Sequence, residues 1–226
     1  MNTTEIKIAD VRLLVTESEK NIQINDIPEE KFEFVWERVV SQYSGYEVFF
    51  CFNSERMAKN QKVPVEFLDK IRAKCIDDML NFKVRTGDFN AASLDGKVEI
   101  ALLTEVGFDE FATFHDTRNP DMFWTSKRIK KRLDIWQIHT SKKNGRLDGY
   151  VMMMSTAKNT EIFAIESCDD LVFKTLLSTA CQNAFTIGKK EVLYMIDTIA
   201  RASHQQAALE IGFKETGFYQ GFQVYL

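Results

Sequence analysis

The sequence predicts an α/β protein with a mixed sheet flanked by helices. The first reason is that, from position 97 onward, apolar runs of strand length alternate with segments whose apolar residues recur at helical spacing. The second is the turn-forming stretch KKNG between two strand-like runs, which indicates a hairpin. The third is that the first 92 residues repeat part of the same order.

From position 97 the predicted order is strand, two helices, three strands, helix, strand, helix and strand. The first helix places Phe108, Phe111, Phe114 and His115 on one face, because they lie at positions i, i+3, i+6 and i+7. This spacing predicts an apolar contact between that helix and the sheet.

The second helix carries the basic run KRIKKR at positions 127–132. We expect this helix to begin after Pro120 and to use Phe123, Ile129 and Leu133 as apolar anchors. A solvated helix face is one interpretation of the basic run. Contact with an acidic substrate, or with the 3′-phosphate of a coenzyme, is the other.

The clearest helix begins near Asp170 and ends before Gly188, because a glycine often terminates a helix. A closing helix, Ser203–Ile211, passes through Gly212 into the final strand. We expect the long helix and the next strand to share one core with strand Ile162–Ile165. The expected members of this core are Leu176, Leu177, Val192, Leu193, Met195 and Phe213.

The first part of the chain repeats the second half of that order, with Gly45 and Gly188 before corresponding strands. Turn-forming residues between Thr86 and Lys97 indicate a linker. We therefore expect a partial N-terminal half-domain at 1–92 and a complete C-terminal domain at 97–226.

Composition excludes several classes of protein. The net charge of −4 gives no general attraction for nucleic acid or anionic membrane, so neither is an expected partner. No run of about 18 apolar residues occurs and the start lacks the features of a signal peptide, which favours the cytoplasm. Four cysteines and three histidines show no metal-ligand spacing, so no metal and reduced thiols are expected.

The closing stretch AALEIGFKETGFYQGFQVYL, together with the order of elements before it, resembles the C-terminal signature of the GCN5-related N-acetyltransferase (GNAT) superfamily. The likeness covers 98–226, and 1–85 is similar to half a copy. The resemblance implies acetyl-CoA as co-substrate, beside the strand EIFAIES, with its pyrophosphate at the N-terminus of the following helix. The coenzyme-binding residues so implied are Ile165, Ser167, Cys168, Asp169, Asp170, Leu171 and Val172.

The chain departs from the family pattern at this junction. The family has Gln or Arg, two residues, Gly, one residue, then Gly or Ala, whereas this chain has Ser167-Cys168-Asp169-Asp170. We expect Ser167 and Asp170 to form a capping box. Each carboxylate close to a pyrophosphate charge would cost between about 1 and about 4 kcal/mol, depending on the local dielectric.

A second departure lies near the final helix. The Tyr that often protonates the leaving thiolate in the family corresponds to Ala208, and a common Asn corresponds to Arg201. The general acid must therefore come from another residue.

Acetyl transfer to an amine needs a base, a hydrogen-bond donor to the thioester carbonyl and an acid. We interpret Glu166 as the base, with a solvated carboxylate at the end of a strand as the alternative. Alternation along a strand predicts that Glu161 lies on the opposite face. A backbone N–H of Glu161–Ser167 would be the donor to the carbonyl.

His204 lies on the same helical face as Ala208 and Ile211 and could act as acid or base, or simply be a packed core residue. Tyr219 and Tyr194 could donate a phenolic proton, although aromatic residues on strands usually belong to the core. Cys168 is interpreted as inert, because neighbouring carboxylates oppose a thiolate.

These expectations favour an acyl-CoA-dependent N-acetyltransferase that acts on a small-molecule amine or a peptide, with a homodimer left open. The alternative is a binding or regulatory module that keeps the fold and has lost coenzyme binding.

Overall fold

A computed structural model of the chain describes residues 3–57, 61–91, 98–120, 122, 124–157, 159–199 and 202–226. The chain divides into two compact units. Unit 1 consists of Met1–Leu80 and Thr216–Leu226, and unit 2 consists of Asn81–Glu215. Among the described residues, no helix combines the length and the apolar character needed to cross a membrane.

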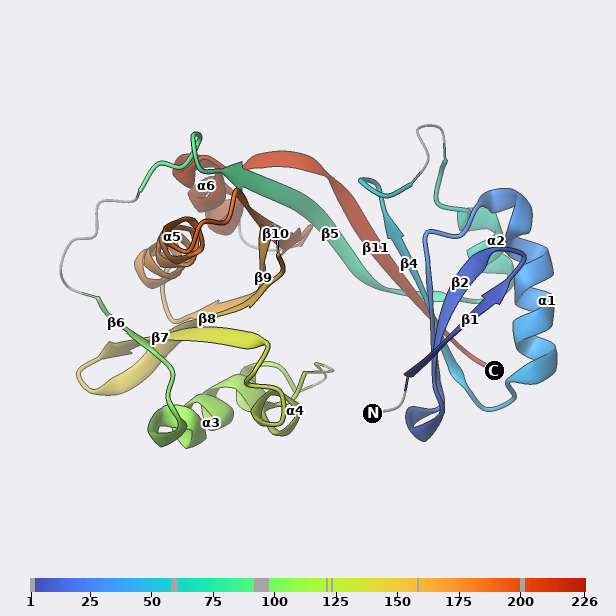
Figure 1. Cartoon of the computed structure of the whole chain (residues 1–226), viewed down its shortest axis with the longest axis horizontal. Helices are drawn as coiled ribbons and strands as arrows, with labels where there is room; N and C mark the ends of the chain where they lie inside the picture. Colours follow the sequence, from blue (N-terminus) through green and yellow to red (C-terminus); the bar gives the residue numbers. More distant parts are fainter. Residues whose placement is uncertain are drawn as a thin grey trace. The chain divides into compact units, whose positions relative to one another are not determined.

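Unit 1 contains a sheet with the strand order β1-β2-β3-β4-β11. β3 and β4 pair in parallel, whereas β1 with β2, β2 with β3 and β4 with β11 pair antiparallel. Helices α1 and α2 lie on one face of the sheet (Figure 1). The elements are β1 (Thr3–Ile8), β2 (Val11–Thr16), β3 (Asn21–Asn25), α1 (Phe32–Gln42), β4 (Glu47–Asn53) and α2 (Val65–Lys70).

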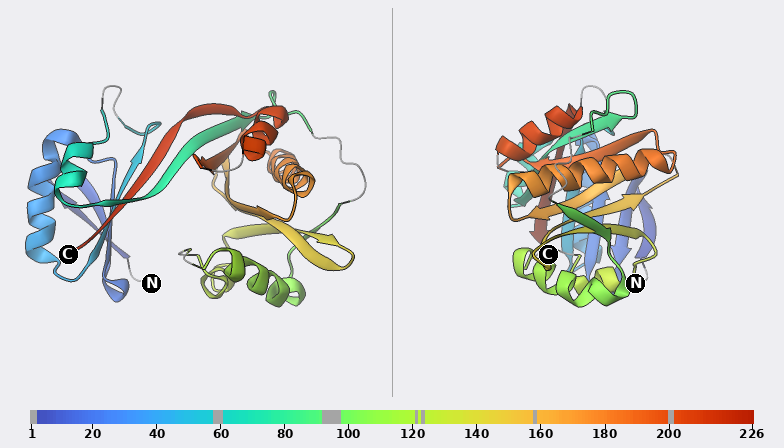
Figure 2. Two further views of the ribbon diagram at one scale, coloured as in Figure 1. Left: turned by 180° about the vertical axis from the view of Figure 1, so that it is seen from behind. Right: turned by 90° about the vertical axis from the view of Figure 1, so that its left-hand side faces the viewer.

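Unit 2 contains the strands β5-β10-β9-β8-β7-β6 in that order, with α5 and α6 on one face and α3 and α4 on the other (Figures 1 and 2). The elements are β6 (Glu99–Leu102), α3 (Phe108–Arg118), α4 (Ser126–Lys130), β7 (Trp136–Lys143), β8 (Arg146–Ser155), β9 (Asn159–Ser167), α5 (Asp170–Thr186), β10 (Glu191–Asp197) and α6 (Ala202–Ile211). Short 3-10 turns occur at Glu17–Glu19, Glu29–Lys31 and Glu105–Gly107.

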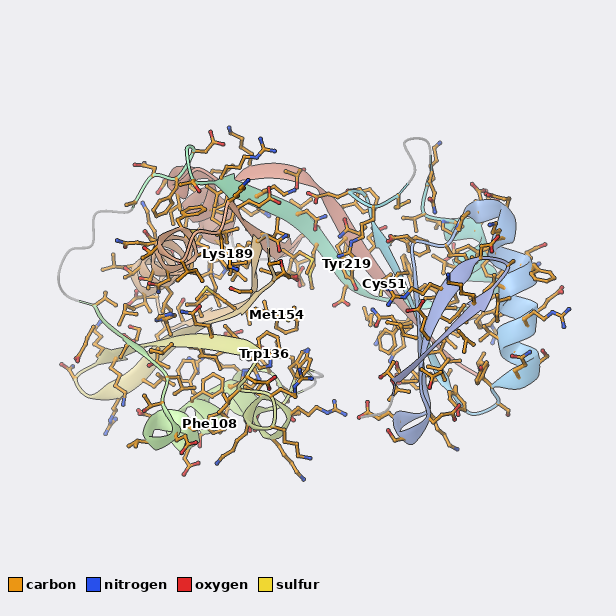
Figure 3. All side chains as sticks on the ribbon, viewed as in Figure 1. Cys51, Phe108, Trp136, Met154, Lys189 and Tyr219 are labelled. Atoms are coloured by element: carbon orange, nitrogen blue, oxygen red, sulfur yellow. The ribbon has the colours of Figure 1, made fainter. Side chains whose placement is uncertain are left out.

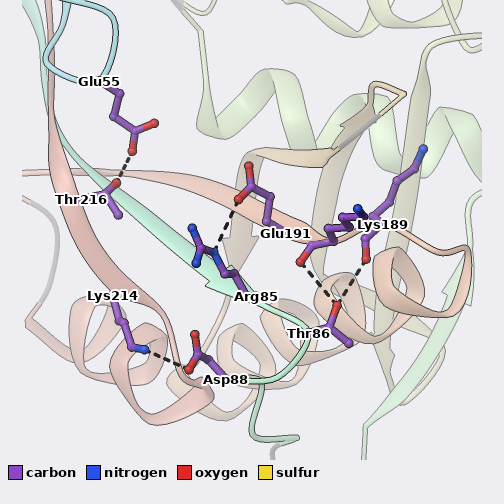
Figure 4. Close-up of polar contacts among 9 residues, drawn as sticks. Glu55, Arg85, Thr86, Asp88, Lys189, Glu191, Lys214 and Thr216 are labelled. Atoms are coloured by element: carbon purple, nitrogen blue, oxygen red, sulfur yellow. Dashed lines mark hydrogen bonds and ion pairs between the residues drawn. The ribbon is translucent and has the colours of Figure 1, made fainter.

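Two long strands, β5 (Lys74–Arg85) and β11 (Lys214–Tyr225), are divided between the units. In unit 1, Tyr219–Tyr225 of β11 pairs antiparallel with β4. In unit 2, the end of β5 meets the start of β10, where Arg85 Nε lies 4.0 Å from a Glu191 carboxylate oxygen (Figure 4). Each of these two strands therefore has residues in both units.

The domain boundary expected between residues 92 and 97 rests on a comparison of two copies of a sequence pattern. That boundary stays a proposal. Residues 92–97 of the expected linker lie outside the described residues. Residues 86–91 of this linker belong to unit 2 and pack against α6 and the start of β11. Asn90 N donates to Ile211 O at 2.9 Å, and Lys214 Nζ lies 2.9 Å from Asp88 Oδ1 (Figure 4). Gly212 is needed here, because φ is +102° and a Cβ atom would lie 2.0 Å from Asp88 O.

The predicted order of elements from position 97 is confirmed in the described residues. The second helix is shorter than expected, since α4 covers only Ser126–Lys130, and Phe123 lies outside the described residues. In the expected core, Leu176, Leu177, Val192 and Phe213 are buried, but Leu193 and Met195 are only partly buried. Strand alternation explains the difference, because it turns Tyr194 and Ile196 inward beside Val192.

Candidate active site

The site of interest lies where β9 and β10 separate. The parallel ladder between these strands pairs Glu191–Tyr194 with Asn159–Ile162 and ends there. Both strands continue, yet within the described chain Phe163–Ser167 has no ladder partner in β10. Backbone N–H and C=O groups on these diverging edges are therefore open to other partners.

A cavity of about 320 Å³ occupies this separation. Residues of both strands line it, together with one residue of α6; they are Ile165, Glu166, Ser167, Tyr194, Met195, Ile196, Asp197 and His204. The structure therefore brings two predicted catalytic residues, Glu166 and His204, to one cavity. Among the described residues no Lys or Arg lines it.

Glu166 is partly buried at this cavity, and burial raises the pKa of its carboxyl group. Three groups on α3 or at its end oppose that effect: first the Arg118 guanidinium, then a hydrogen bond from the Asn119 side chain, and then His115. The raised pKa brings the carboxyl group closer to neutral pH, where a general base works best.

A buried hydrogen-bond network connects Glu166 to the core between α3 and the sheet. His115 and Tyr150 are fully buried, and His115 Nδ1 lies 2.6 Å from the Tyr150 hydroxyl oxygen. His115 Nε2 lies 2.7 Å from the carbonyl oxygen of Trp124, so Nε2 carries the proton and Nδ1 accepts from Tyr150 in the neutral ring. Asn119 Nδ2 donates to the Tyr150 hydroxyl at 3.3 Å and its side chain also bonds to Glu166.

The face on which Glu161 lies differs from the prediction. A bulge in β9 leaves Phe163 unpaired, since Met152 pairs with Ala164 and the adjacent Met153 pairs with Ile162. The extra residue reverses the alternation. Glu161 and Glu166, opposite Met154 and Tyr150 on β8, therefore share the face that packs against α3.

The start of α5 also corrects a prediction. Asp169, not Ser167, is the N-cap: its backbone is extended and its Oδ1 accepts from Val172 N at 2.8 Å. Asp170 does not close a capping box, because it is the first residue of α5 and not the third; its carboxylate accepts from the Ser203 hydroxyl at 3.1 Å. The proposed coenzyme loop thus carries its own anion at the helix N-terminus.

This junction is unfavourable for a pyrophosphate. Asp169 holds the Val172 amide, and Cys168 N donates to Asp148 O at 2.8 Å, so two of the amides that would face the phosphates already have partners. The carboxylates of Asp169 and Asp170 add negative charge at the same place. The start of α5 therefore offers a phosphate fewer free amides and more negative charge than an uncapped helix N-terminus would.

The other predicted catalytic residues have these surroundings. The His204 ring stacks on Phe173, with centroids 3.8 Å apart and 3° between the planes. Tyr194 lines the cavity, and its pKa is raised first by burial and then by the charge of Glu166. Tyr219 does not line it; it belongs to unit 1, pairs with Asn53 and forms a hydrogen bond with Cys51 (Figure 3).

Sequence reasoning missed three residues near Glu166: Arg118 and Asn119 at the end of α3, and Tyr150 on β8, which bonds to His115. His115 was placed correctly on the apolar face of its helix, and a buried histidine needs hydrogen-bond partners. This requirement predicts that His115 has a hydrogen-bond partner, but it does not identify a tyrosine on a strand as that partner. Arg201, where the family has an Asn, lies outside the described residues. Among those that are described, no group of His, Cys, Asp and Glu is placed to hold a metal ion.

No protein-family model matches this chain, and no curated protein sequence does. Solved structures do match it. A functionally unknown conserved protein from Staphylococcus epidermidis has a TM-score of 0.72 at 14% identity, over 99% of this chain and 94% of that one. A GCN5-related N-acetyltransferase from Kribbella flavida has a TM-score of 0.67 at 11% identity, over 98% of this chain and 89% of that one.

A tandem GNAT protein from the clavulanic acid biosynthesis pathway is also similar, with a TM-score of 0.62 at 8% identity over 95% of this chain and 78% of that one. At such low identity these likenesses concern the fold alone. The chain therefore has a mixed sheet with flanking helices of the GNAT type. Its chemistry has to be argued from the cavity.

Proposed function

We propose that unit 2 transfers an acetyl group from acetyl-CoA to an amine. One observation carries the proposal: β9 and β10 separate after Tyr194 and leave a cavity with a partly buried carboxylate, Glu166, on its wall. The GNAT-type fold of the similar proteins supports it by analogy.

Glu166 is the proposed base. In the reaction, the carboxylate takes a proton from the ammonium, and the neutral amine nitrogen then attacks the thioester carbonyl carbon. The C–S bond breaks, the thiolate takes a proton from the general acid, and the nitrogen releases its second proton to solvent. Burial favours the protonated product form of Glu166, and the Asn119 amide holds the carboxylate in place. The result is a base that accepts a proton more readily than an exposed glutamate does.

The unpaired edge of β9 supplies the proposed donor to the carbonyl oxygen. A backbone N–H within Phe163–Ser167 would stabilise the negative charge that develops there. His204, across the cavity on α6, is the proposed proton donor to the thiolate. Tyr219 has no proposed catalytic role, because its hydroxyl is engaged with Cys51 in unit 1.

A second function is favoured by the α5 junction. Since Asp169 already caps the helix, a non-catalytic module that no longer binds the coenzyme would have this same loop. The two functions differ in coenzyme affinity. An organised site gives a dissociation constant near the micromolar range, equivalent to about 8 kcal/mol.

Glu166→Gln is the decisive variant for catalysis. We expect wild type to release free CoA from acetyl-CoA in the presence of an acceptor amine, and Glu166→Gln to lose about 10²–10⁴-fold in kcat/KM. Glu161→Gln, on the same face, is the matched control and should keep the rate. Equal rates in wild type and Glu166→Gln would remove Glu166 from the base role, and no heat with millimolar acetyl-CoA would favour the second function.

The proposed location is the cytoplasm. All four cysteines are free thiols, including the exposed Cys75 and Cys168, and reduced thiols persist in a reducing compartment.

A further inference from the structure

Arg118, the last residue of α3, places its guanidinium group over the Phe114 ring and close to the end of β9. The guanidinium carbon lies 3.9 Å from the centroid of the Phe114 ring, one turn earlier in the helix. Its Nη2 donates to Cys168 Sγ at 3.5 Å, just beyond the end of β9. A ring below and a thiol beside it therefore orient this side chain, which remains exposed.

Among the residues that the structure describes, the Arg118 guanidinium group makes a ring contact and a thiol contact but no ion pair with a carboxylate. Three lysines of unit 2 do pair with a carboxylate: Lys142 with Glu110, Lys174 with Glu210 and Lys214 with Asp88. Arginine presents two parallel N–H groups that match a carboxylate in a bidentate pair. An oriented guanidinium group that pairs with none of the described carboxylates can therefore bind an anion from outside the protein.

Arg118 is also close to the proposed base. Its charge acts on Glu166 and on Tyr150, and Asn119, the next residue, bonds to both of those side chains. Glu166 and Arg118 do not form an ion pair with each other. A carboxylate and a guanidinium placed in this way can bind the ammonium and the carboxylate of one zwitterion.

The helix that follows adds positive charge. Asp116 of α3 holds α4 in place by accepting from Ser126 N at 2.8 Å and from Ser126 Oγ at 2.6 Å. Exposed Lys127 and Lys130 lie on α4, within the basic run 127–132. An anionic acceptor would be attracted to this side of unit 2.

Building on the proposed function, we infer that the acceptor is an amine that carries a carboxylate group, with the ammonium at Glu166 and the carboxylate on Arg118. This is the chemistry of a free amino acid or of a related amino carboxylate. Arg118 is then the residue that determines specificity, and Glu166 performs the same step for every amine.

The test uses the full chain and matched amines with and without a carboxylate: glycine and methylamine, β-alanine and ethylamine, γ-aminobutyrate and propylamine, phenylalanine and phenethylamine. Two readouts are measured for each: acetylation of the amine, and the shift of the Arg118 Nε–Hε NMR signal on adding the amine alone. Arg118→Gln removes the charge, and Arg118→Lys keeps it without the planar fork.

Arg38→Gln is the matched control, because Arg38 also stacks on a phenylalanine of its own helix, Phe34, at 5.4 Å, but does so on α1 of unit 1. We expect at least one amino carboxylate to be preferred about tenfold or more over its partner amine, and this preference to be lost in Arg118→Gln. It should be partly kept in Arg118→Lys and unchanged in Arg38→Gln.

The outcomes separate this inference from the proposed function. If no amine is acetylated but carboxylate amines still shift the Arg118 signal, carboxylate recognition stands and acetyl transfer fails. If acetylation occurs with the same preference in wild type and Arg118→Gln, acetyl transfer stands and this inference is overturned. It is overturned as well if no carboxylate amine is preferred in either readout.

Discussion

Replacing Asp169 separates its negative charge from its role as a helix cap. Asp169→Asn keeps an oxygen that can accept from Val172 N, whereas Asp169→Ala removes both the cap and the charge. If the carboxylate hinders coenzyme binding, both variants should bind CoA more tightly than wild type. Only Asp169→Ala should lose stability, by about 1 kcal/mol.

The gain in affinity can be bounded from the geometry. Two like charges 4 Å apart repel by about 1 kcal/mol in water-like surroundings and by about 4 kcal/mol at an effective dielectric of 20. Asp169 is partly exposed, and Lys143 Nζ lies 3.9 Å from its Oδ2, so the lower value applies. One kcal/mol corresponds to about a fivefold lower dissociation constant.

Isothermal titration with CoA gives the affinity and urea denaturation gives the stability. Asp134→Asn changes the net charge equally at an exposed ion pair with Arg132 and serves as the control. Unchanged CoA affinity in both Asp169 variants would show that the carboxylate is no obstacle. The description of this junction as unfavourable for pyrophosphate would then be wrong.

Three further predictions follow from burial and pairing. Burial raises the pKa of Glu166 in the folded state, so the ionisation of this group lowers the stability of the protein as pH rises through that folded pKa. By calorimetry, Glu166→Gln should therefore have a higher melting temperature than wild type at pH 7 and the same melting temperature at about pH 4. Equal melting temperatures at both pH values would contradict this. Leu176→Ala, at a fully buried position of α5, should lower the free energy of unfolding by about 2–5 kcal/mol in urea; a loss under 1 kcal/mol would mean that the site is not packed as described. A fragment of residues 97–226 should aggregate, because the β11 segment Tyr219–Tyr225 loses its β4 partner; a fragment that stays monomeric and melts cooperatively would argue against this pairing.

Local patterns were sufficient to predict the elements of unit 2. The helical spacing of Phe108, Phe111 and His115 correctly identified the buried face of α3, and Gly188, with φ of +82°, follows α5 as expected. Alternation failed where the chain adds a residue, as at the Phe163 bulge, because a bulge depends on the partner strand and leaves no mark in a single strand.

The candidate site was predictable only in part. Glu166 and His204 follow from the resemblance to a known strand and helix order, and the structure does bring them to one cavity. Asp169 replaced Ser167 as the cap because β9 continues through Ser167 and α5 begins only at Asp170. Arg118 and Asn119 could not be paired with Glu166, since contacts between a helix end and a distant strand depend on tertiary packing.

Titration of isotope-labelled protein with acetyl-CoA, followed through backbone amide NMR signals, tests the central claim most directly. We expect the amides of Phe163–Ser167 and Met195–Asp197, on the separated edges of β9 and β10, to shift on binding. We expect little change at the Val172 amide, which Asp169 already holds. No shift at the strand edges with millimolar acetyl-CoA would contradict the proposal that this cavity binds the acyl donor.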